Sequence, residues 1–282
     1  MLTALHILEA ALPMLYLAAF AVYLRYFLTT SPTEEAQGFW GTKLLWGVIA
    51  THVLYLVLRG GVYHAFPLAA RPEFLTLLAL SVSMVYALGE WRTKEHHTGM
   101  FFLGISFTFQ ILASGLMEDP DAQSMLLEHP SLQNPIFAVH VVAMLLAFSA
   151  LAVGALYAMM YILMERQLKA RELGLFFKRL PPLLKLESMS NTATVTGVVL
   201  LGLGLGLGHF VALYLGVDYD LTDPKVLIMD LAWLGYILGA VVVKVRAMGG
   251  LFSGYLALGG YVTLMSMVAL SNFIATSFHS FH

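Results

Sequence analysis

Long apolar stretches recur along the chain and are separated by short polar segments. Stretches near the ~20 residues that a helix needs to cross a bilayer lie at roughly 4–28, 41–58, 73–91, 98–117, 136–164, 193–215, 226–246 and 251–275. This pattern predicts an all-α, polytopic integral membrane protein with eight transmembrane helices. It also predicts a single membrane domain over residues 1–282, with no large soluble domain.

The composition agrees with a membrane protein. Of 282 residues, 59% are hydrophobic and 11% are charged, and the mean hydropathy of +0.80 is too high for a soluble domain of this length. The chain has no cysteine, which excludes disulfides, thiolate metal ligands, iron–sulfur clusters and covalent c-type haem attachment. Nothing in the composition supports nucleic-acid binding. The segment from Met1 to Glu9 lacks a basic n-region, so we expect an uncleaved first span.

Basic residues divide unevenly between the two sides of this eight-helix arrangement. One side holds Arg25, Lys43, Arg92, Lys94, Arg166, Lys169, Arg171, Lys178, Arg179, Lys185, Lys244 and Arg246, and the other holds Arg59, Arg71 and Lys225. Membrane proteins keep their Lys-rich and Arg-rich loops in the cytoplasm. Both termini are therefore predicted to lie on the outer, extracytoplasmic side.

Two histidines are expected near the outer ends of long helices. A polar loop ending in Asn134-Pro135 leads into an apolar helix and sets His140 about one and a half turns inside it. His279, near the C-terminal end, should lie at the same depth on the same side. Histidines in such positions bind a metal or haem, relay protons, or contact a polar substrate. Any haem would be held non-covalently, because the chain has no cysteine.

The second span places His52, Tyr55 and Arg59 at positions i, i+3 and i+7, on one face of a helix. A histidine with an arginine nearer the outer surface would suit a haem whose propionates point outward. Alternatively, Arg59 reaches the surface along its own apolar stem and His52 bonds to a neighbouring helix.

The sixth span contains four glycines at every second position before His209. Gly202 and Gly206, and Gly204 and Gly208, form two overlapping small-xxx-small pairs. Such pairs suit close helix packing, or a flat cofactor that lies against bare backbone. His209 then follows as a candidate ligand or as a polar residue at a helix end.

The seventh span carries an acidic residue, Asp230, about one turn inside its outer end. Intramembrane carboxylates are usually functional, and Asp230 could orient a ligand imidazole or pair with Arg59 or Arg71. It could also be only a polar helix start. Trp233 nearby fits either an aromatic belt or the wall of a haem site.

The inner segment over residues 165–191 alternates basic and apolar residues. Such a pattern is typical of an amphipathic segment that lies on the surface of a leaflet. We therefore expect residues 165–191 to form an amphipathic loop on the inner leaflet.

Two short elements resemble a known family. The segment from Leu132-Gln133-Asn134 to His140-Val141 resembles the part of the cytochrome c assembly family (CcsA/HemX-like membrane haem-handling proteins) that carries an outer haem-ligand histidine. The ending Phe278-His279-Ser280-Phe281 resembles that family's C-terminal histidine-serine-aromatic element, which holds the partner ligand. The similarity covers about residues 40–282. With side and depth, it implies one haem b held by His140 and His279 as axial ligands.

A second haem pair, His52 with His209, is a further expectation because both residues lie in outer halves of their helices. Arg59 and Asp230 would assist at these cofactor sites. The resemblance also shows a departure, because the haem lyases of this family carry a tryptophan-rich motif where residues 216–222 contain no tryptophan. This difference argues against thioether-forming lyase activity and places the chain nearer the HemX-like branch.

The resemblance implies a bacterial cytoplasmic (inner) membrane protein that binds one or two haems in support of cytochrome c maturation or haem trafficking. Its expected partners are haem, the lipid bilayer, and other cytochrome c maturation proteins or an electron-transfer complex. Two other functions stay open. One is a haem b subunit for electron transfer or quinone reaction, and the other is a haem-free proton-coupled transporter centred on Asp230 and His52.

Overall fold

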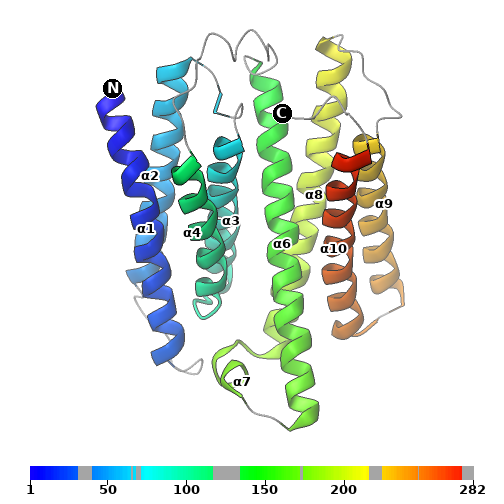
Figure 1. The fold of residues 1–282 in the computed structure, drawn as a ribbon. Coiled ribbons are helices and arrows are strands. Elements are labelled where there is room, and N and C mark those ends of the chain that lie inside the picture. The colour runs from blue at the N-terminus through cyan, green and yellow to red at the C-terminus, as the bar shows by residue number, and fades with distance from the viewer. Residues whose placement is uncertain are drawn as a thin grey trace. The chain divides into compact units, whose positions relative to one another are not determined.

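The computed structural model describes residues 1–30, 40–64, 66–67, 71–116, 134–171, 174–215, 224–246 and 248–274 (Figure 1). Over these residues, eight helices are long and apolar enough to cross a membrane. The predicted all-α, eight-helix membrane fold is therefore confirmed.

The spanning helices agree closely with the apolar stretches of the sequence. They are α1 (Leu2–Thr29), α2 (Trp40–Tyr63), α3 (Arg71–Thr93), α4 (Gly99–Leu116), α6 (Pro135–Ala170), α8 (Leu183–Leu215), α9 (Pro224–Val245) and α10 (Gly250–Ile274), and a short helix α7 (Leu175–Arg179) lies between α6 and α8. Most helix ends fall within a few residues of the prediction. The exceptions are the ends of α6 and α8 that face α7.

The amphipathic loop predicted over residues 165–191 is mostly helical in the structure. Helix α6 continues to Ala170, where Arg171 adopts a left-handed φ of 58° and ends it. Helix α8 begins at Leu183, directly after Pro181-Pro182. Proline is tolerated just before or at the first position of a helix, where no intrahelical N–H bond is lost. The basic and apolar alternation therefore belongs largely to extensions of two spanning helices.

The chain forms two compact units, which we describe separately. Unit 1 consists of Met1–Ala138 and Gly174–Pro181, and unit 2 consists of Val139–Leu173 and Pro182–His282. The short helix α7 thus belongs to unit 1, although its neighbours in the sequence belong to unit 2. The single domain predicted over residues 1–282 stays a prediction.

Unit 1 is a bundle of four spanning helices. Helix α1 packs against α2 and α4, and α3 packs against the same two helices. The interior is unusually rich in large side chains with a polar end, since Tyr16, Tyr23, Tyr55, Tyr86 and Arg59 are all buried. Such residues must find hydrogen-bond partners inside the bundle, because the hydrocarbon core of a bilayer offers none.

Unit 2 contains α8, α9 and α10 in mutual contact, with α6 packed closely on α8. The approach of α6 and α8 depends on glycine: a Cβ atom on Gly197 would lie 2.7 Å from Cγ of Leu151. On the other helix, Gly154 accepts a hydrogen bond at its carbonyl from the hydroxyl of Ser190 at 2.8 Å. Small residues let membrane helices approach at backbone distance, and here they bring α8 against the helix that carries His140.

Candidate functional site

The ring of His140 is fixed by a backbone carbonyl of the neighbouring helix. Its Nδ1 atom lies 2.7 Å from the carbonyl oxygen of Gly204. A carbonyl only accepts hydrogen bonds, so Nδ1 carries the hydrogen and the lone pair of the neutral imidazole is on Nε2. Metal-ligating histidines commonly have this arrangement, with one nitrogen donating to a carbonyl or carboxylate and the other facing the metal.

The glycines of α8 make room for this histidine. A Cβ atom on Gly208 would lie 2.7 Å from Cε1 of His140, and one on Gly204 would lie 2.6 Å from Sδ of Met144. Gly202 faces α9, where a Cβ atom would lie 2.7 Å from Nε1 of Trp233, whereas a Cβ atom on Gly206 would meet nothing within 4 Å. The helix-packing interpretation is confirmed for Gly202, Gly204 and Gly208, and Gly208 also lies against the edge of the His140 ring.

Asp230 lies beside a second histidine of unit 2. Its Oδ1 atom is 3.3 Å from Nε2 of His209, and the two side chains are 35% and 32% exposed. Asp230 was expected to orient an imidazole, to pair with an arginine, or to be a polar helix start. The structure shows its carboxylate next to an imidazole. Trp233, one turn after Asp230 on α9, donates from Nε1 to the carbonyl of Val198 at 3.0 Å. This bond also joins α9 to α8.

His52 lies in the interior of unit 1 and is completely buried. Its Nδ1 atom is 2.9 Å from the hydroxyl of Tyr16, and its Nε2 atom is 3.0 Å from the hydroxyl of Thr76. Ligation of an iron by His52 would require one of these bonds to break. The proposed pairing of His52 with His209 joins residues of different units and stays a prediction.

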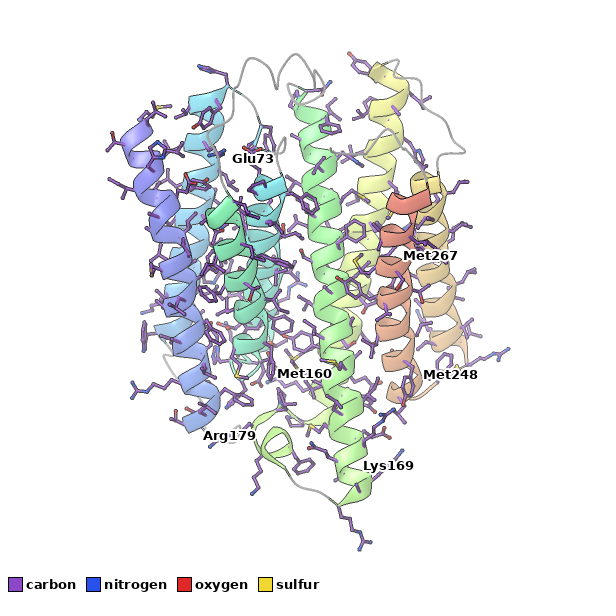
Figure 2. All side chains as sticks on the ribbon, viewed as in Figure 1. Glu73, Met160, Lys169, Arg179, Met248 and Met267 are labelled. Atoms are coloured by element: carbon purple, nitrogen blue, oxygen red, sulfur yellow. The ribbon has the colours of Figure 1, made fainter. Side chains whose placement is uncertain are left out.

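Arg59 does not reach the surface along its stem. Its side chain is 1% exposed, and its Nε atom donates to Oε1 of Glu73 at 2.9 Å. The guanidinium carbon also lies 5.0 Å from the centre of the Tyr63 ring. The sequence reasoning missed Glu73, because a single acidic residue at the start of a span resembles a polar helix start. The pairing of Glu73 (labelled in Figure 2) with a residue on α2 is evident only from the folded structure.

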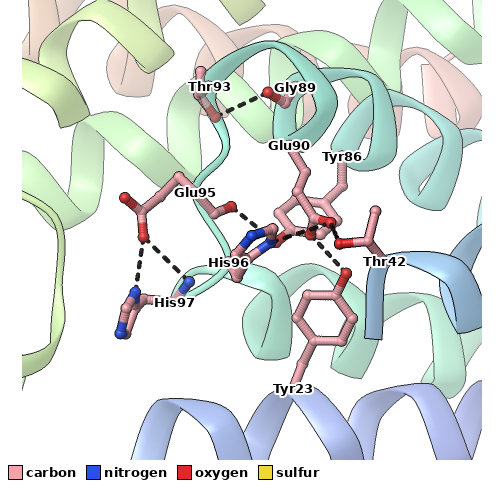
Figure 3. Close-up of polar contacts among 9 residues, drawn as sticks. All are labelled: Tyr23, Thr42, Tyr86, Gly89, Glu90, Thr93, Glu95, His96 and His97. Atoms are coloured by element: carbon pink, nitrogen blue, oxygen red, sulfur yellow. Dashed lines mark hydrogen bonds and ion pairs between the residues drawn. The ribbon is translucent and has the colours of Figure 1, made fainter. Parts of the chain in front are cut away.

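A second group of polar residues that the sequence reasoning missed lies at the opposite end of unit 1 from Glu73. Figure 3 shows Glu90 at its centre, with Tyr23 donating to Oε2 at 2.6 Å and Thr42 donating to Oε1 at 2.5 Å. Nδ1 of His96 lies 3.3 Å from the same carboxylate. A buried carboxylate with three polar neighbours is a candidate functional group in its own right.

His279 lies outside the described residues, so its role as the partner axial ligand stays a prediction. Within the described ranges, no group of three or more His, Asp or Glu side chains is arranged to hold a bare metal ion. A haem iron needs fewer protein ligands than a bare metal ion, because the porphyrin supplies four ligands and the chain supplies only the axial ones.

Comparisons with known proteins give a consistent result. The sequence matches the family model described as cytochrome C assembly protein over residues 68–279. The cytochrome c biogenesis protein CcsA of Synechococcus sp. (strain JA-3-3Ab) is 32% identical over 116 residues, which cover 40% of this chain and 33% of that protein. The inner membrane protein YpjD of Escherichia coli (strain K12) is 32% identical over 105 residues, 37% of this chain and 38% of that protein. The matches thus span little more than a third of these relatives. No solved structure matches.

Proposed function

Because the chain belongs to the cytochrome c assembly protein family, we propose that it serves cytochrome c maturation by holding haem b non-covalently within the membrane. The axial ligands in this proposal are His140 and His279, near the face that the charge distribution predicts to be extracytoplasmic. The membrane location is supported by eight candidate spanning helices and by a relative named as an inner membrane protein.

The observation that carries the haem proposal is the hydrogen bond from His140 to Gly204. At 2.7 Å it fixes the tautomer and the plane of the ring before any ligand arrives. Gly208 lies against the ring edge and limits its rotation. A preoriented neutral imidazole loses little conformational freedom on ligation. When bound, haem would supply an iron that can accept an electron, and the chain's own residues would set its position and exposure.

The proposed activity is haem binding or delivery rather than thioether formation. Haem lyases of the family carry tryptophans in a motif whose counterpart here, residues 216–222, contains none. The partners we propose are haem, the bilayer and other cytochrome c maturation proteins. A redox role with quinol is the alternative that the same histidines would serve.

The test is an absorption spectrum of the detergent-purified protein, oxidised and dithionite-reduced, with a pyridine haemochrome assay for haem type and stoichiometry. Sharp low-spin α and β bands from one or two haems b per chain are the expected result. A protein that stays colourless after haem addition would overturn the proposal. Fast reduction by a quinol analogue would favour the electron-transfer role over haem delivery.

A further inference from the structure

Polar residues line the face of α3 that lies inside unit 1. Glu73, Thr76, Ser83 and Glu90 are spaced by three, seven and seven residues, which keeps them on one face of the helix. Each is at most 3% exposed. Glu73 and Glu90 are about 25 Å apart along the helix axis, close to the ~30 Å thickness of a bilayer's hydrocarbon core. Unit 1 thus has a buried carboxylate near each end of its spanning region.

One turn from Glu73, Thr76 belongs to a hydrogen-bonded chain that includes side chains from all four helices of the bundle. Thr76 donates to Oε1 of Gln110 at 2.7 Å, so the Thr76 oxygen accepts from Nε2 of His52. Nδ1 of His52 then accepts from the hydroxyl of Tyr16. Gln110 completes the chain by donating to Ser114 at 3.1 Å. His52 is therefore a neutral imidazole that donates on one side and accepts on the other.

This chain can also run in the opposite direction. If the amide of Gln110 turns over, Thr76 donates to His52, and His52 donates to Tyr16. Imidazoles and hydroxyls that each donate and accept pass a proton by reversing their bonds in turn. Ser83 lies two turns from Thr76 on the same face of α3, and its hydroxyl donates to that of Ser106 at 2.9 Å.

The end of unit 1 predicted to face the cytoplasm offers a route to water. The Glu90 side chain is 1% exposed, whereas that of His96, at 3.3 Å from it, is 11% exposed. Tyr23 and Thr42 hold the carboxylate from α1 and α2. Figure 3 shows His96 beside the Glu90 carboxylate, and its partial exposure places it to exchange protons with that buried group.

A second histidine, His97, lies next to His96 in the sequence and has two acceptor neighbours. Nδ1 of His97 lies 2.9 Å from Oε1 of Glu95, and its Nε2 lies 3.3 Å from the carbonyl of Thr30. Carboxylate and carbonyl oxygens are both acceptors, so both ring nitrogens of His97 face hydrogen-bond acceptors. Arg179 of α7 donates to the same Thr30 carbonyl at 2.6 Å and adds a fixed positive charge.

At the other end of unit 1, Glu73 lies one turn from Thr76 and is paired with Arg59. Glu9 on α1 and Tyr55 on α2 also act on this guanidinium electrostatically. A fixed positive charge repels an excess proton, so the Arg59 charge opposes proton passage at this end.

We propose that the interior of unit 1 is a proton relay, separate from the haem site of unit 2 and independent of it. Glu90 takes a proton through His96, His52 passes it at the centre of the bundle, and Glu73 receives it at the far end. Between Glu90 and Ser83 the proton travels about 10 Å along α3, past the rings of Tyr23 and Tyr86, whose centres are 5.9 Å apart. This step therefore requires the two rings to separate and admit water. One proton enters and one leaves, without redox chemistry.

The competing explanation is that these polar groups only hold the four helices in register. Buried polar networks can specify helix packing without any transport role. That explanation predicts loss of stability when a member is removed, and no proton flux in the intact protein. The relay predicts flux, and loss of flux in variants that stay folded.

The experiment uses the full chain in liposomes that contain a pH-sensitive dye, with a potassium gradient and valinomycin to drive proton entry. We expect faster acidification than in protein-free liposomes. Glu90→Gln should slow that protein-dependent rate by about 100-fold, the scale for losing a proton-transfer group. Glu187→Gln makes the same change on α8 of unit 2 and should leave the rate unchanged.

Tyr23→Phe is the second variant, in case Glu90→Gln does not fold. It keeps the ring and removes the hydroxyl that donates to Glu90, so flux should fall while gel filtration stays monodisperse. Infrared difference spectra give a readout that packing alone would not move, because a protonated Glu90 contributes a carboxylic C=O band absent from the glutamine variant. Flux in the unmodified protein equal to that of protein-free liposomes would overturn the relay, as would full flux in folded Glu90→Gln.

Discussion

Unit 1 and unit 2 both group long apolar helices, but they place their polar side chains differently. In unit 1 the central groups, His52, Thr76 and Glu73, are at most 3% exposed and have protein partners. In unit 2, His209 and Asp230 keep about a third of their side-chain surface exposed, and His140 is half-buried.

Histidine thus has two different hydrogen-bonding environments in one membrane protein. A histidine with both nitrogens occupied by hydroxyls, as in unit 1, is suited to pass protons among its neighbours. A histidine with one nitrogen bonded to a backbone carbonyl, as His140 is in unit 2, has the orienting hydrogen bond that metal-ligating histidines commonly have. Each of the following changes tests one side of this comparison.

The largest expected effect is on haem content. His140→Ala removes the ring that Gly204 orients, so we expect nearly all the haem b at this site to be lost. His279→Ala should do the same, as the proposed partner ligand. Pyridine haemochrome measurements on purified variants give the answer, with His6→Ala as the control because that side chain is half exposed at the start of α1. Unchanged haem in both variants would remove this site from the proposal.

The largest stability effect belongs to the buried ion pair of unit 1. Arg59→Ala leaves the carboxylate of Glu73 without its positive partner, and breaking such a pair costs about 3–5 kcal/mol. Unfolding in mild detergent, followed by circular dichroism, measures the loss. The exposed Arg25→Ala on α1 is the control. The double variant Arg59→Met with Glu73→Leu should recover most of the stability, since no buried charge is left over.

Gly208→Ala should disturb His140 without changing its chemistry. The added methyl group would lie 2.7 Å from Cε1 of the ring, so the ring or the helix must shift, at a cost of about 1–3 kcal/mol. We expect weaker haem binding in a titration with haemin and broadened low-spin bands. Gly206→Ala is the matched control on the same helix, because its methyl group would meet nothing within 4 Å. Equal effects from the two variants would contradict the supporting role of Gly208.

Thr76→Val tests the closed network of unit 1. Valine keeps the shape but removes the hydroxyl that lies between His52 and Gln110. Leaving such buried groups unsatisfied costs about 1–3 kcal/mol. Thermal unfolding should show this loss, while haem content stays at the unmodified level. Thr51→Val is the comparison, since the Thr51 hydroxyl bonds only to the Gly47 carbonyl of its own helix. A Thr76 variant as stable as the Thr51 variant would contradict the network.

The smallest expected effect is that of Asp230→Asn. The pair with His209 is partly exposed, and such pairs contribute at most about 1 kcal/mol. We expect little change in unfolding temperature and unchanged haem content. A large loss of haem in this variant would instead assign His209 a direct part in the haem site.

The helices were predictable because hydrophobic runs of bilayer length determine where a chain can cross a membrane. The predicted ends of α6 and α8 next to α7 in the sequence were too short, because charged residues interrupt the apolar pattern there. There, the absence of helix breakers before Arg171 and after Pro182 decides the helix length, and hydropathy gives no information about it. The stripe of His52, Tyr55 and Arg59 was also visible, and all three are buried.

The partners of these residues were not predictable from the sequence. Glu73 and Thr76 each reach a residue on α2, and that choice depends on which helices are neighbours in the bundle. One signal was available, since Glu73, Thr76, Ser83 and Glu90 repeat on a single helical face. The tautomer of His140 needed the carbonyl of Gly204, 64 residues away, and no pattern of side chains reveals a backbone partner.

The assignment of α7 to unit 1 has a consequence for how the gene could be divided. Residues 174–181 complete unit 1, but they are encoded after α6, and most of α6 belongs to unit 2. A split between residues 116 and 134 would therefore give a first fragment that lacks Arg179 and its bond to Thr30. The second fragment would contain all of unit 2 together with α7, so the first fragment could acquire its last helix only if the two were produced together.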